Sequence, residues 1–283
     1  MKILLSILLL PSYLIAGDLP VAKGLILDLD AQKGLTLEHG NKVSQWENQA
    51  PGNTARLFIK QDEGRKLAGS GRPTLRKAIK DLNGRSSLVF QQGELVCHDE
   101  DTFDCLITGS GFTWLAVVCA HQQRVGLKDV NAFFGNLRNS AKYEGMWACF
   151  KDDNTLWTGP RNGLTFGRFD QNNPQLTGPA VEQDRFYVIA GRMQAGEGSV
   201  PTTLYLNGVK PVATAVFPVN PAANPSRMVI GQERDAINHP GLESFDGEIA
   251  RLLIYKRPLD EDELAKTIQH LIETYGIKVG SGN

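Results

Sequence analysis

The sequence has little net charge, and no long apolar run follows its first residues. Its 283 residues include 30 lysines and arginines against 31 aspartates and glutamates, which gives a formal net charge of −1. Because the chain has no net positive charge to attract a polyanion, we expect no nucleic acid partner. No later segment is long and apolar enough to cross a bilayer, so we expect no membrane span. With 41% hydrophobic residues, the chain is also too apolar for a disordered protein.

Motifs of the common catalytic classes are missing as well. The sequence contains no Gly-x-Gly-x-x-Gly, P-loop, Gly-x-Ser-x-Gly or His-Glu-x-x-His pattern. The five histidines are scattered and no Cys-x-x-Cys occurs, which argues against a zinc site. These absences favour a protein that is not an enzyme, and they leave that question open.

The first 17 residues have the layout of a secretory signal. Lys2 precedes the apolar residues 3–10, and the small pair Ala16-Gly17 follows. The alternative is a buried N-terminal element. We expect residues 1–17 to be removed and residues 18–283 to form a single domain that is secreted or periplasmic.

Four cysteines fit an oxidising compartment, in which thiols pair. Three pairings are open for Cys97, Cys105, Cys119 and Cys149. Cys97 with Cys105 would close a short loop, and Cys119 with Cys149 would join neighbouring strands. The alternative is four buried thiols, which are common in protein cores.

Short runs of β-forming residues between turn residues make up most of the chain. The pair Asn207-Gly208 predicts a two-residue hairpin turn, because both positions of a type I′ turn need positive φ. One helix is indicated near the C-terminus, where Asp260 and Glu263 have capping-box spacing and Gly276 occupies a C-cap position. We therefore expect an all-β, two-sheet antiparallel jelly-roll sandwich with this helix packed outside.

Several segments that together span most of the chain after the signal share the pattern of one known family: residues 24–31, Val43 to Trp46, Gly71 to Thr74, Leu82 to Arg85, Leu88 to Phe90, Phe245 to Ala250, Ile254 to Leu259 and Tyr275 to Ile277. These segments resemble the laminin-G-like, concanavalin A-like jelly-roll domains of bacterial secreted proteins. One departure is Asp28, which stands where the first strand of that family usually carries an aromatic residue. The resemblance implies the concanavalin A-like fold and a lectin-like, carbohydrate-binding function. The glycosidase members of this fold resemble one another in a Glu-x-Asp-x-x-Glu motif, which this sequence lacks.

Strand alternation predicts an aromatic face for ligand binding. In the run from Tyr143 to Phe150, the residues Met146, Ala148 and Phe150 share one side, which we interpret as core, and Tyr143 and Trp147 share the other. An exposed indole offers a flat apolar surface on which sugar C–H groups stack. The expected ligand-binding residues are Trp147, Trp157, Tyr143, Arg161 and Asn154. The alternative is that both tryptophans fill the core, as most tryptophans do.

No cofactor is certain, although calcium is one candidate. Asp152 and Asp153 are the proposed metal ligands, in a loop that lacks EF-hand spacing.

The sequence thus predicts a secreted, non-catalytic recognition module that binds an extracellular glycan or polysaccharide through an aromatic-bearing sheet face. The first alternative is a structural or adhesive domain that contacts a cell-surface protein. A divergent glycoside hydrolase is the second.

Overall fold

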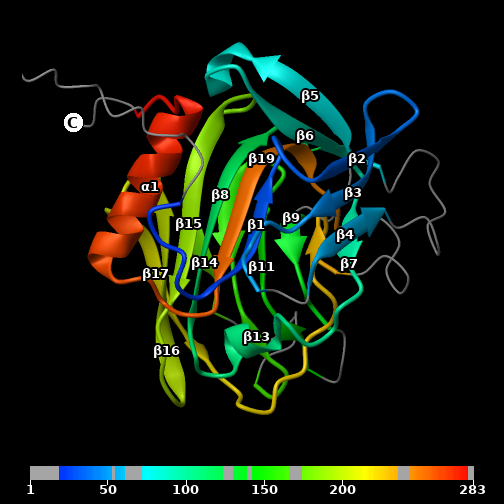
Figure 1. The fold of residues 1–283 in the computed structure, drawn as a ribbon. Helices are drawn as coiled ribbons and strands as arrows, with labels where there is room; N and C mark the ends of the chain where they lie inside the picture. Colours follow the sequence, from blue (N-terminus) through cyan, green and yellow to red (C-terminus); the bar gives the residue numbers. More distant parts are fainter. Residues whose placement is uncertain are drawn as a thin grey trace, which may run out of the picture.

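The computed structural model describes residues 19–52, 55–60, 72–123, 130–138, 142–165, 174–234 and 243–279. Within them the chain is almost entirely β-structure, with one α-helix near its C-terminal end (Figure 1). The predicted signal at residues 1–17 lies outside the described residues. No helix in the described part of the chain is long and apolar enough to cross a membrane.

The elements follow one another along the chain in this order: β1 (Leu25–Asp30), β2 (Leu35–Glu38), β3 (Lys42–Glu47), β4 (Leu57–Lys60), β5 (Thr74–Ile79), the 3-10 helix η1 (Lys80–Leu82), β6 (Arg85–Gln91), β7 (Leu95–Cys97), the 3-10 helix η2 (Asp104–Ile107), β8 (Phe112–Ala120), β9 (Asn131–Gly135), β10 (Glu144–Gly145), β11 (Trp147–Phe150), β12 (Thr155–Thr158), β13 (Arg161–Asn162), β14 (Leu176–Ala180), β15 (Phe186–Met193), β16 (Ser199–Leu206), β17 (Pro211–Pro218), β18 (Val229–Ile230), β19 (Asp246–Tyr255) and α1 (Glu261–Tyr275).

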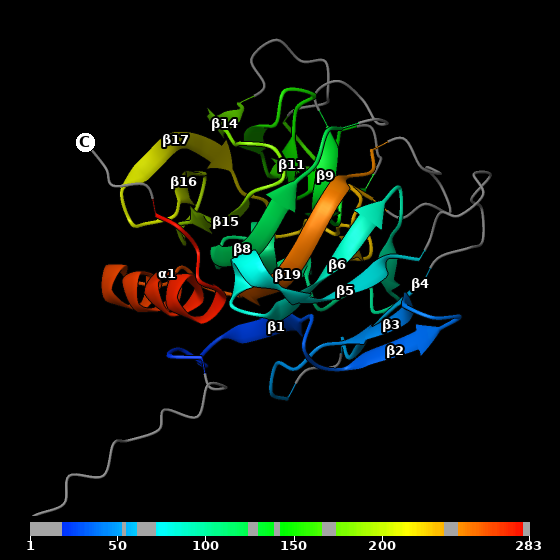
Figure 2. The same ribbon diagram turned by 90° about the horizontal axis from the view of Figure 1, so that it is seen from above.

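The strands pair antiparallel in two long runs that meet at β3. One run is β17–β16–β15–β8–β19. The second half of β19 pairs with β1, and its first half pairs with β6, which in turn pairs with β5. The second run is β4–β7–β18–β9–β11–β12–β14. Because β3 pairs with both β4 and β5, hydrogen bonds connect 17 strands into one large sheet that curls almost into a barrel (Figure 2).

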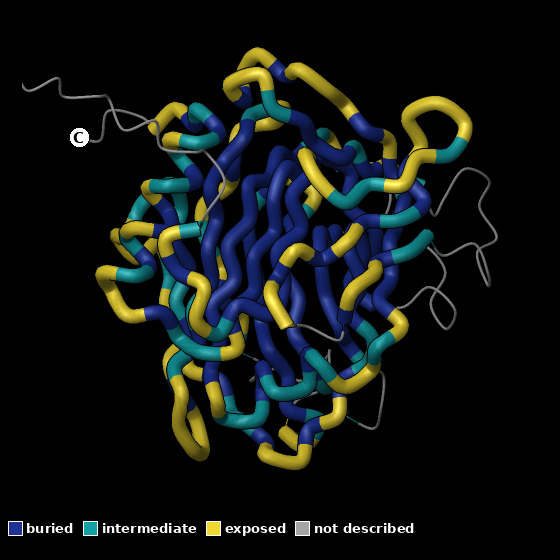
Figure 3. The backbone as a smooth tube through the Cα atoms, in the orientation of Figure 1, coloured by how far each residue is buried: buried dark blue, intermediate teal, exposed yellow. Residues whose placement is uncertain are grey.

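Side-chain alternation on β8 produces two separate cores. Trp114, Ala116 and Val118 belong to the main core enclosed by the curled sheet. Leu115, Val117 and Cys119 point to the opposite face and join a second core that includes residues of α1. All nine residues of β8 are buried, and the strands at the centre of the molecule are buried along most of their length (Figure 3).

The helix α1 begins and ends as its sequence predicts. The carboxylate of Asp260 accepts a hydrogen bond from the Glu263 amide, and the Glu263 side chain accepts one from the Asp260 amide, which completes the capping box. Gly276 closes the helix in the left-handed region, with φ of 64°. Leu264, Ile268 and Leu271 cover the outer face of the sheet, so the predicted outside position of the helix is confirmed (Figure 2).

The predicted hairpin at Asn207 is present, but its turn is longer than two residues. β16 ends at Leu206 and β17 begins only at Pro211, and only Asn207 of the predicted pair has a positive φ. The reason is a competing contact, because Asn207 exchanges hydrogen bonds with Val188 of β15. That contact ties Asn207 to the neighbouring strand and leaves Gly208 outside the type I′ geometry.

Candidate functional site

The two tryptophans expected to form the binding face are buried. Trp157 on β12 is the register partner of Cys149 on β11, and Trp147 lies two residues before Cys149 on the same strand. The two indole rings meet edge to face, with 5.5 Å between their centres. The predicted alternation is confirmed, because Met146, Ala148 and Phe150 lie in the main core and both indoles lie on the other side of the strands. However, Trp147 is only 3% exposed and Trp157 only 5%, so neither indole provides a surface for a sugar ring to stack on.

Arg161 and Tyr143 join this buried aromatic cluster. The Arg161 guanidinium carbon lies 5.2 Å from the centre of the Trp147 ring, and burial lowers the pKa of Arg161 to about 10. Tyr143 is half-buried, packs against the same cluster and has the guanidinium of Arg234 over its ring at 5.8 Å. Four of the five expected ligand-binding residues therefore lie close together, and they pack against one another.

Asn154 lies apart from this cluster, in the turn before β12. It has a positive φ of 59°, and its side chain accepts a hydrogen bond from Gln123. The neighbouring Asp153 carboxylate accepts a hydrogen bond from the Thr155 amide, and Asp152 accepts one from Asn131 at 3.5 Å. Asp152 and Asp153 belong to no group of three or more metal-ligating side chains among the described residues. Calcium binding at this loop stays a prediction.

The four cysteines are free thiols in the structure, so neither disulfide of the expected pairing is present. Cys119 lies in the core under α1 and Cys149 lies in the cluster with Trp147, so these two side chains face different parts of the molecule. Burial raises the pKa of Cys97 to about 11, which keeps this thiol protonated at neutral pH.

A different group of polar side chains surrounds Glu248 near the start of β19. The Glu248 side chain is only 2% exposed, and its Oε1 accepts hydrogen bonds from Arg76 Nη1 at 2.6 Å and from His121 Nε2 at 3.2 Å. Its other carboxylate oxygen accepts a hydrogen bond from the Ser87 hydroxyl. Burial alone would raise the pKa of Glu248, but the hydrogen bonds from His121 and Ser87 and the charge of Arg76 hold it below its ordinary value. Glu248 is therefore a fixed buried anion.

His121 follows β8 and connects Glu248 to the surface. The hydrogen bond to Glu248 raises the pKa of His121, and the negative charge of Asp184 acts in the same direction. Asp184 Oδ1 lies 3.8 Å from His121 Nε2, and the Asp184 side chain is largely exposed. The group can thus hold a proton on His121 between a buried and an exposed carboxylate.

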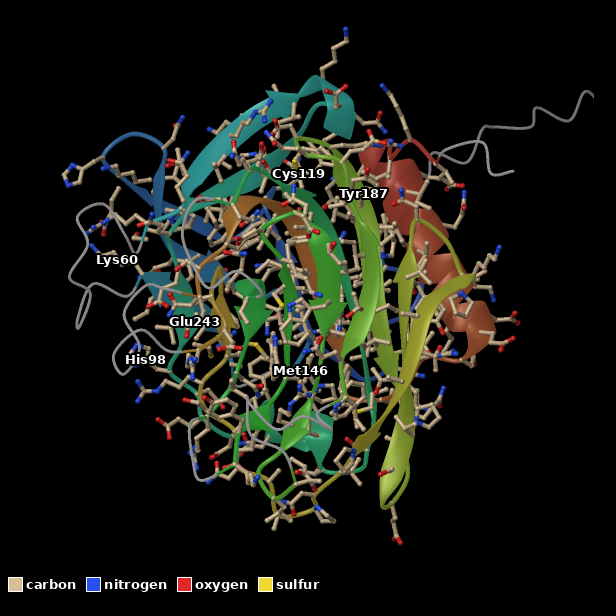
Figure 4. All side chains as sticks on the ribbon, turned by 180° about the vertical axis from the view of Figure 1, so that it is seen from behind. Lys60, His98, Cys119, Met146, Tyr187 and Glu243 are labelled. Carbon is tan, nitrogen blue, oxygen red and sulfur yellow. The ribbon has the colours of Figure 1, made fainter. Side chains whose placement is uncertain are left out.

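A pocket of about 180 Å³ lies beside this group, where the β5–β6 hairpin approaches the end of α1. It is lined by Arg76, Ile79, Asp81, Asp184, Arg185, Phe186, Gly276, Ile277 and Lys278. We call it the Arg76–Arg185 pocket. Figure 4 labels Cys119 on β8 and Tyr187 on β15 at the same end of the sheet.

Both arginines of the pocket are held in place and partly exposed. The Arg76 side chain is 55% exposed beyond its contact with Glu248. Arg185 donates to Glu182 and to the Lys278 carbonyl, and its guanidinium lies over the Tyr187 ring at 5.2 Å. Guanidinium groups in fixed positions are suited to binding a carboxylate or a phosphate.

Sequence reasoning missed this site because its members are far apart in the chain. Glu248 is 127 residues from His121 and 172 from Arg76. The sequence does show that Cys119 and His121 are two residues apart, so that both side chains can lie on one side of a strand. Placing Glu248 beside them requires the register of β8 and β19, which pairs Glu248 with Cys119.

Comparison with solved structures identifies sialidases of similar fold. The Trypanosoma rangeli sialidase in complex with the inhibitor DANA matches with a TM-score of 0.52 at 14% identity, over 92% of this chain and 34% of that one. The same sialidase in complex with sialic acid matches with a TM-score of 0.51 at 14% identity, over 93% and 35%. This chain therefore spans about a third of the length of these proteins. No curated protein matches the sequence.

These findings correct the functional prediction made from the sequence. The predicted function, recognition of a glycan through an aromatic-bearing sheet face, is wrong, because both indoles are buried. The solved structures of similar fold are sialidases. Neither finding tests ligand contact by Arg161, Tyr143 or Asn154, which stays a prediction.

The family resemblance, in contrast, is confirmed. Residues 130–265 match the family model described as the concanavalin A-like lectin/glucanases superfamily. This match covers β9 to the first residues of α1. The match agrees with the resemblance seen in the sequence, and residues 130–265 are the part of the chain that is similar to this family.

Proposed function

We propose that the chain is a sialic-acid-related domain that holds the carboxylate of an acidic sugar in the Arg76–Arg185 pocket. The observation that carries this proposal is that two partly exposed guanidinium groups line one pocket. Lys278 adds a third cation, against the carboxylates of Asp81 and Asp184. At about 180 Å³ the pocket is smaller than sites of roughly 300–1,000 Å³ that enclose whole ligands. It is therefore suited to the charged end of a glycan.

The fold comparison supports the same ligand class. Sialic acid, which is bound in one of the similar sialidase structures, is a sugar that carries a carboxylate. Arginine pairs with a carboxylate through two parallel hydrogen bonds, which gives both affinity and orientation. Since the chain spans about a third of the sialidase length, we propose that it performs one part of the task that a sialidase carries out.

We also infer that the two runs of strands are the two sheets of a jelly-roll sandwich. Trp114 of β8 meets Phe133 and Phe134 of β9 edge to face, which supports two layers packed across the main core. In this arrangement β3 is the strand that passes from one sheet to the other.

We further propose that the protein is exported, as a single domain of residues 18–283, after removal of residues 1–17. The basic residue, apolar run and small pair at the start of the chain support this proposal. An exported protein would meet sialylated glycans outside the cell or in the periplasm.

Calorimetric titration with α2,3-sialyllactose and with lactose tests the proposed ligand class. We expect the chain to bind sialyllactose and not lactose, because only the former carries a carboxylate. Arg185→Ala should weaken binding roughly 10-fold or more, through loss of a charge-assisted hydrogen bond. Arg227→Ala is the matched control, since Arg227 pairs with Glu100 outside the pocket. Equal affinity for both sugars, or no binding of either, would contradict the proposal.

A further inference from the structure

A cysteine, a histidine and a carboxylate converge next to the Arg76–Arg185 pocket. Cys119 and Glu248 are register partners across β8 and β19, and His121 follows Cys119 by two residues. One ligand atom from each side chain lies within 4.8 Å of the other two. In the described part of the chain, this is the one group of three or more such residues close enough to share a metal ion.

We propose that Cys119, His121 and Glu248 bind one zinc-class divalent transition metal ion. The sulfur, nitrogen and oxygen donors match the ligands that zinc takes in proteins, whereas calcium and magnesium take oxygen ligands. His121 Nε2 and Glu248 Oε1 are 3.2 Å apart. Tetrahedral zinc with bonds of about 2.0–2.1 Å holds two such ligands roughly 3.3 Å apart, so this pair has the required spacing once the ion replaces the proton that His121 Nε2 donates to Glu248.

The surroundings of the three side chains also resemble those of a metal site. The Ser87 hydroxyl donates to Glu248 and fixes the orientation of the carboxylate, which is the task of outer hydrogen bonds around metal ligands. Asp184 Oδ1 is 3.8 Å from His121 Nε2 on the exposed side, where it can attract a cation. Three protein ligands leave a fourth position for water or another group, as in catalytic zinc sites.

The Arg76 guanidinium competes with a metal ion for this position. It contacts the Glu248 oxygen that would bind the metal, at 2.6 Å. Its side chain is 55% exposed, so it can turn toward solvent when an ion takes its place. The three proposed ligands do not line the pocket, but Arg76 and Asp184 border both sites, so metal binding and sugar binding are measured separately.

Titration of the full chain with Co²⁺ under reducing conditions tests the site. We expect one Co²⁺ per chain, visible-region bands of tetrahedral cobalt and a sulfur-to-cobalt charge-transfer band in the near ultraviolet. Zn²⁺ should abolish these bands by displacement. Cys119→Ser should remove the charge-transfer band, and His121→Asn should weaken Co²⁺ binding at least ~10-fold.

Cys149→Ser is the matched control, since Cys149 is also a buried thiol on a β-strand but lies in another cluster. It should leave all bands unchanged, and near-ultraviolet circular dichroism of each variant checks that the fold is retained. Absence of a charge-transfer band in the unmodified chain, or its persistence in a folded Cys119→Ser variant, would overturn the proposal. Calorimetry with sialyllactose is read separately, so failure of one proposal is distinguishable from failure of the other.

Discussion

Arg251 donates two hydrogen bonds of 2.9 Å to the carboxylate of Asp28, so that the two side chains form a buried bidentate ion pair between β19 and β1. This contact explains why an acid occupies the position where the family usually has an aromatic residue. Asp30 is part of the same group, since its Oδ2 lies 3.8 Å from Arg251 Nη1, and its carboxylate also accepts a hydrogen bond from the Tyr275 hydroxyl of α1. The acid pair of the first strand thus connects sheet and helix.

Breaking this ion pair should strongly destabilise the fold. Arg251→Met leaves the Asp28 carboxylate buried without its partner, which costs about 3–5 kcal/mol in comparable buried pairs. The double variant Asp28→Leu/Arg251→Met removes both charges and should recover most of that loss. Urea unfolding of the single and double variants measures the difference. Equal destabilisation by the two would show that the charge left behind is not the cause.

Gly191 should tolerate no side chain, because it lies opposite Trp114 in the β8–β15 pair. A Cβ at this position would overlap the Trp114 indole. Gly191→Ala should therefore lower the free energy of unfolding by about 1–3 kcal/mol through overpacking. Gly178→Ala is the control, since its Cβ would make ordinary contacts of 3.5 Å or more with Leu156. A thermal melt in which both variants resemble the parent would contradict this prediction.

The N-terminal end of α1 should lose stability in strong acid. The hydrogen bonds from Arg257 lower the pKa of Glu263 to about 2, from an ordinary value of 4.5. Because the folded pKa lies below the unfolded one, this contribution is complete above pH 4.5 and is lost as the pH falls through about 2. The pair is near the surface, so the contribution should stay below about 1 kcal/mol. Unfolding of Glu263→Gln between pH 2 and 6 should show a smaller acid loss than the parent chain.

Asp104 should make the fold less stable as the pH rises, which is the opposite of the effect of Glu263. Burial, together with the charge of Asp101, raises the pKa of Asp104 to about 7, so the folded chain retains a proton that the unfolded chain releases near pH 3.8. Stability should therefore fall as the pH rises from about 4 to 7. Asp104→Asn carries no titrating proton, and its unfolding free energy should change less between pH 5 and 8. An unchanged pH dependence in this variant would assign the effect to another group.

The sequence correctly predicted those features that depend only on residues close together in the chain. The capping box of Asp260 and Glu263 and the inward set of Met146, Ala148 and Phe150 depend on spacing alone, and the structure confirms both. Trp46 and Trp114 are fully buried in the main core.

The functional prediction failed because burial of the outer sheet face is not a local property. Alternation places Trp147 on that face, but its cover includes Arg161, which lies beyond β12. The Arg76–Arg185 pocket depends in the same way on contacts between distant segments. Only the strand register and the position of α1 bring them together.

A crystal structure of the chain with α2,3-sialyllactose would test the central claim most directly. We predict that the sugar carboxylate lies within hydrogen-bond distance of Arg76 or Arg185, next to the end of α1. A sialyllactose molecule bound with its carboxylate away from both arginines would contradict the account.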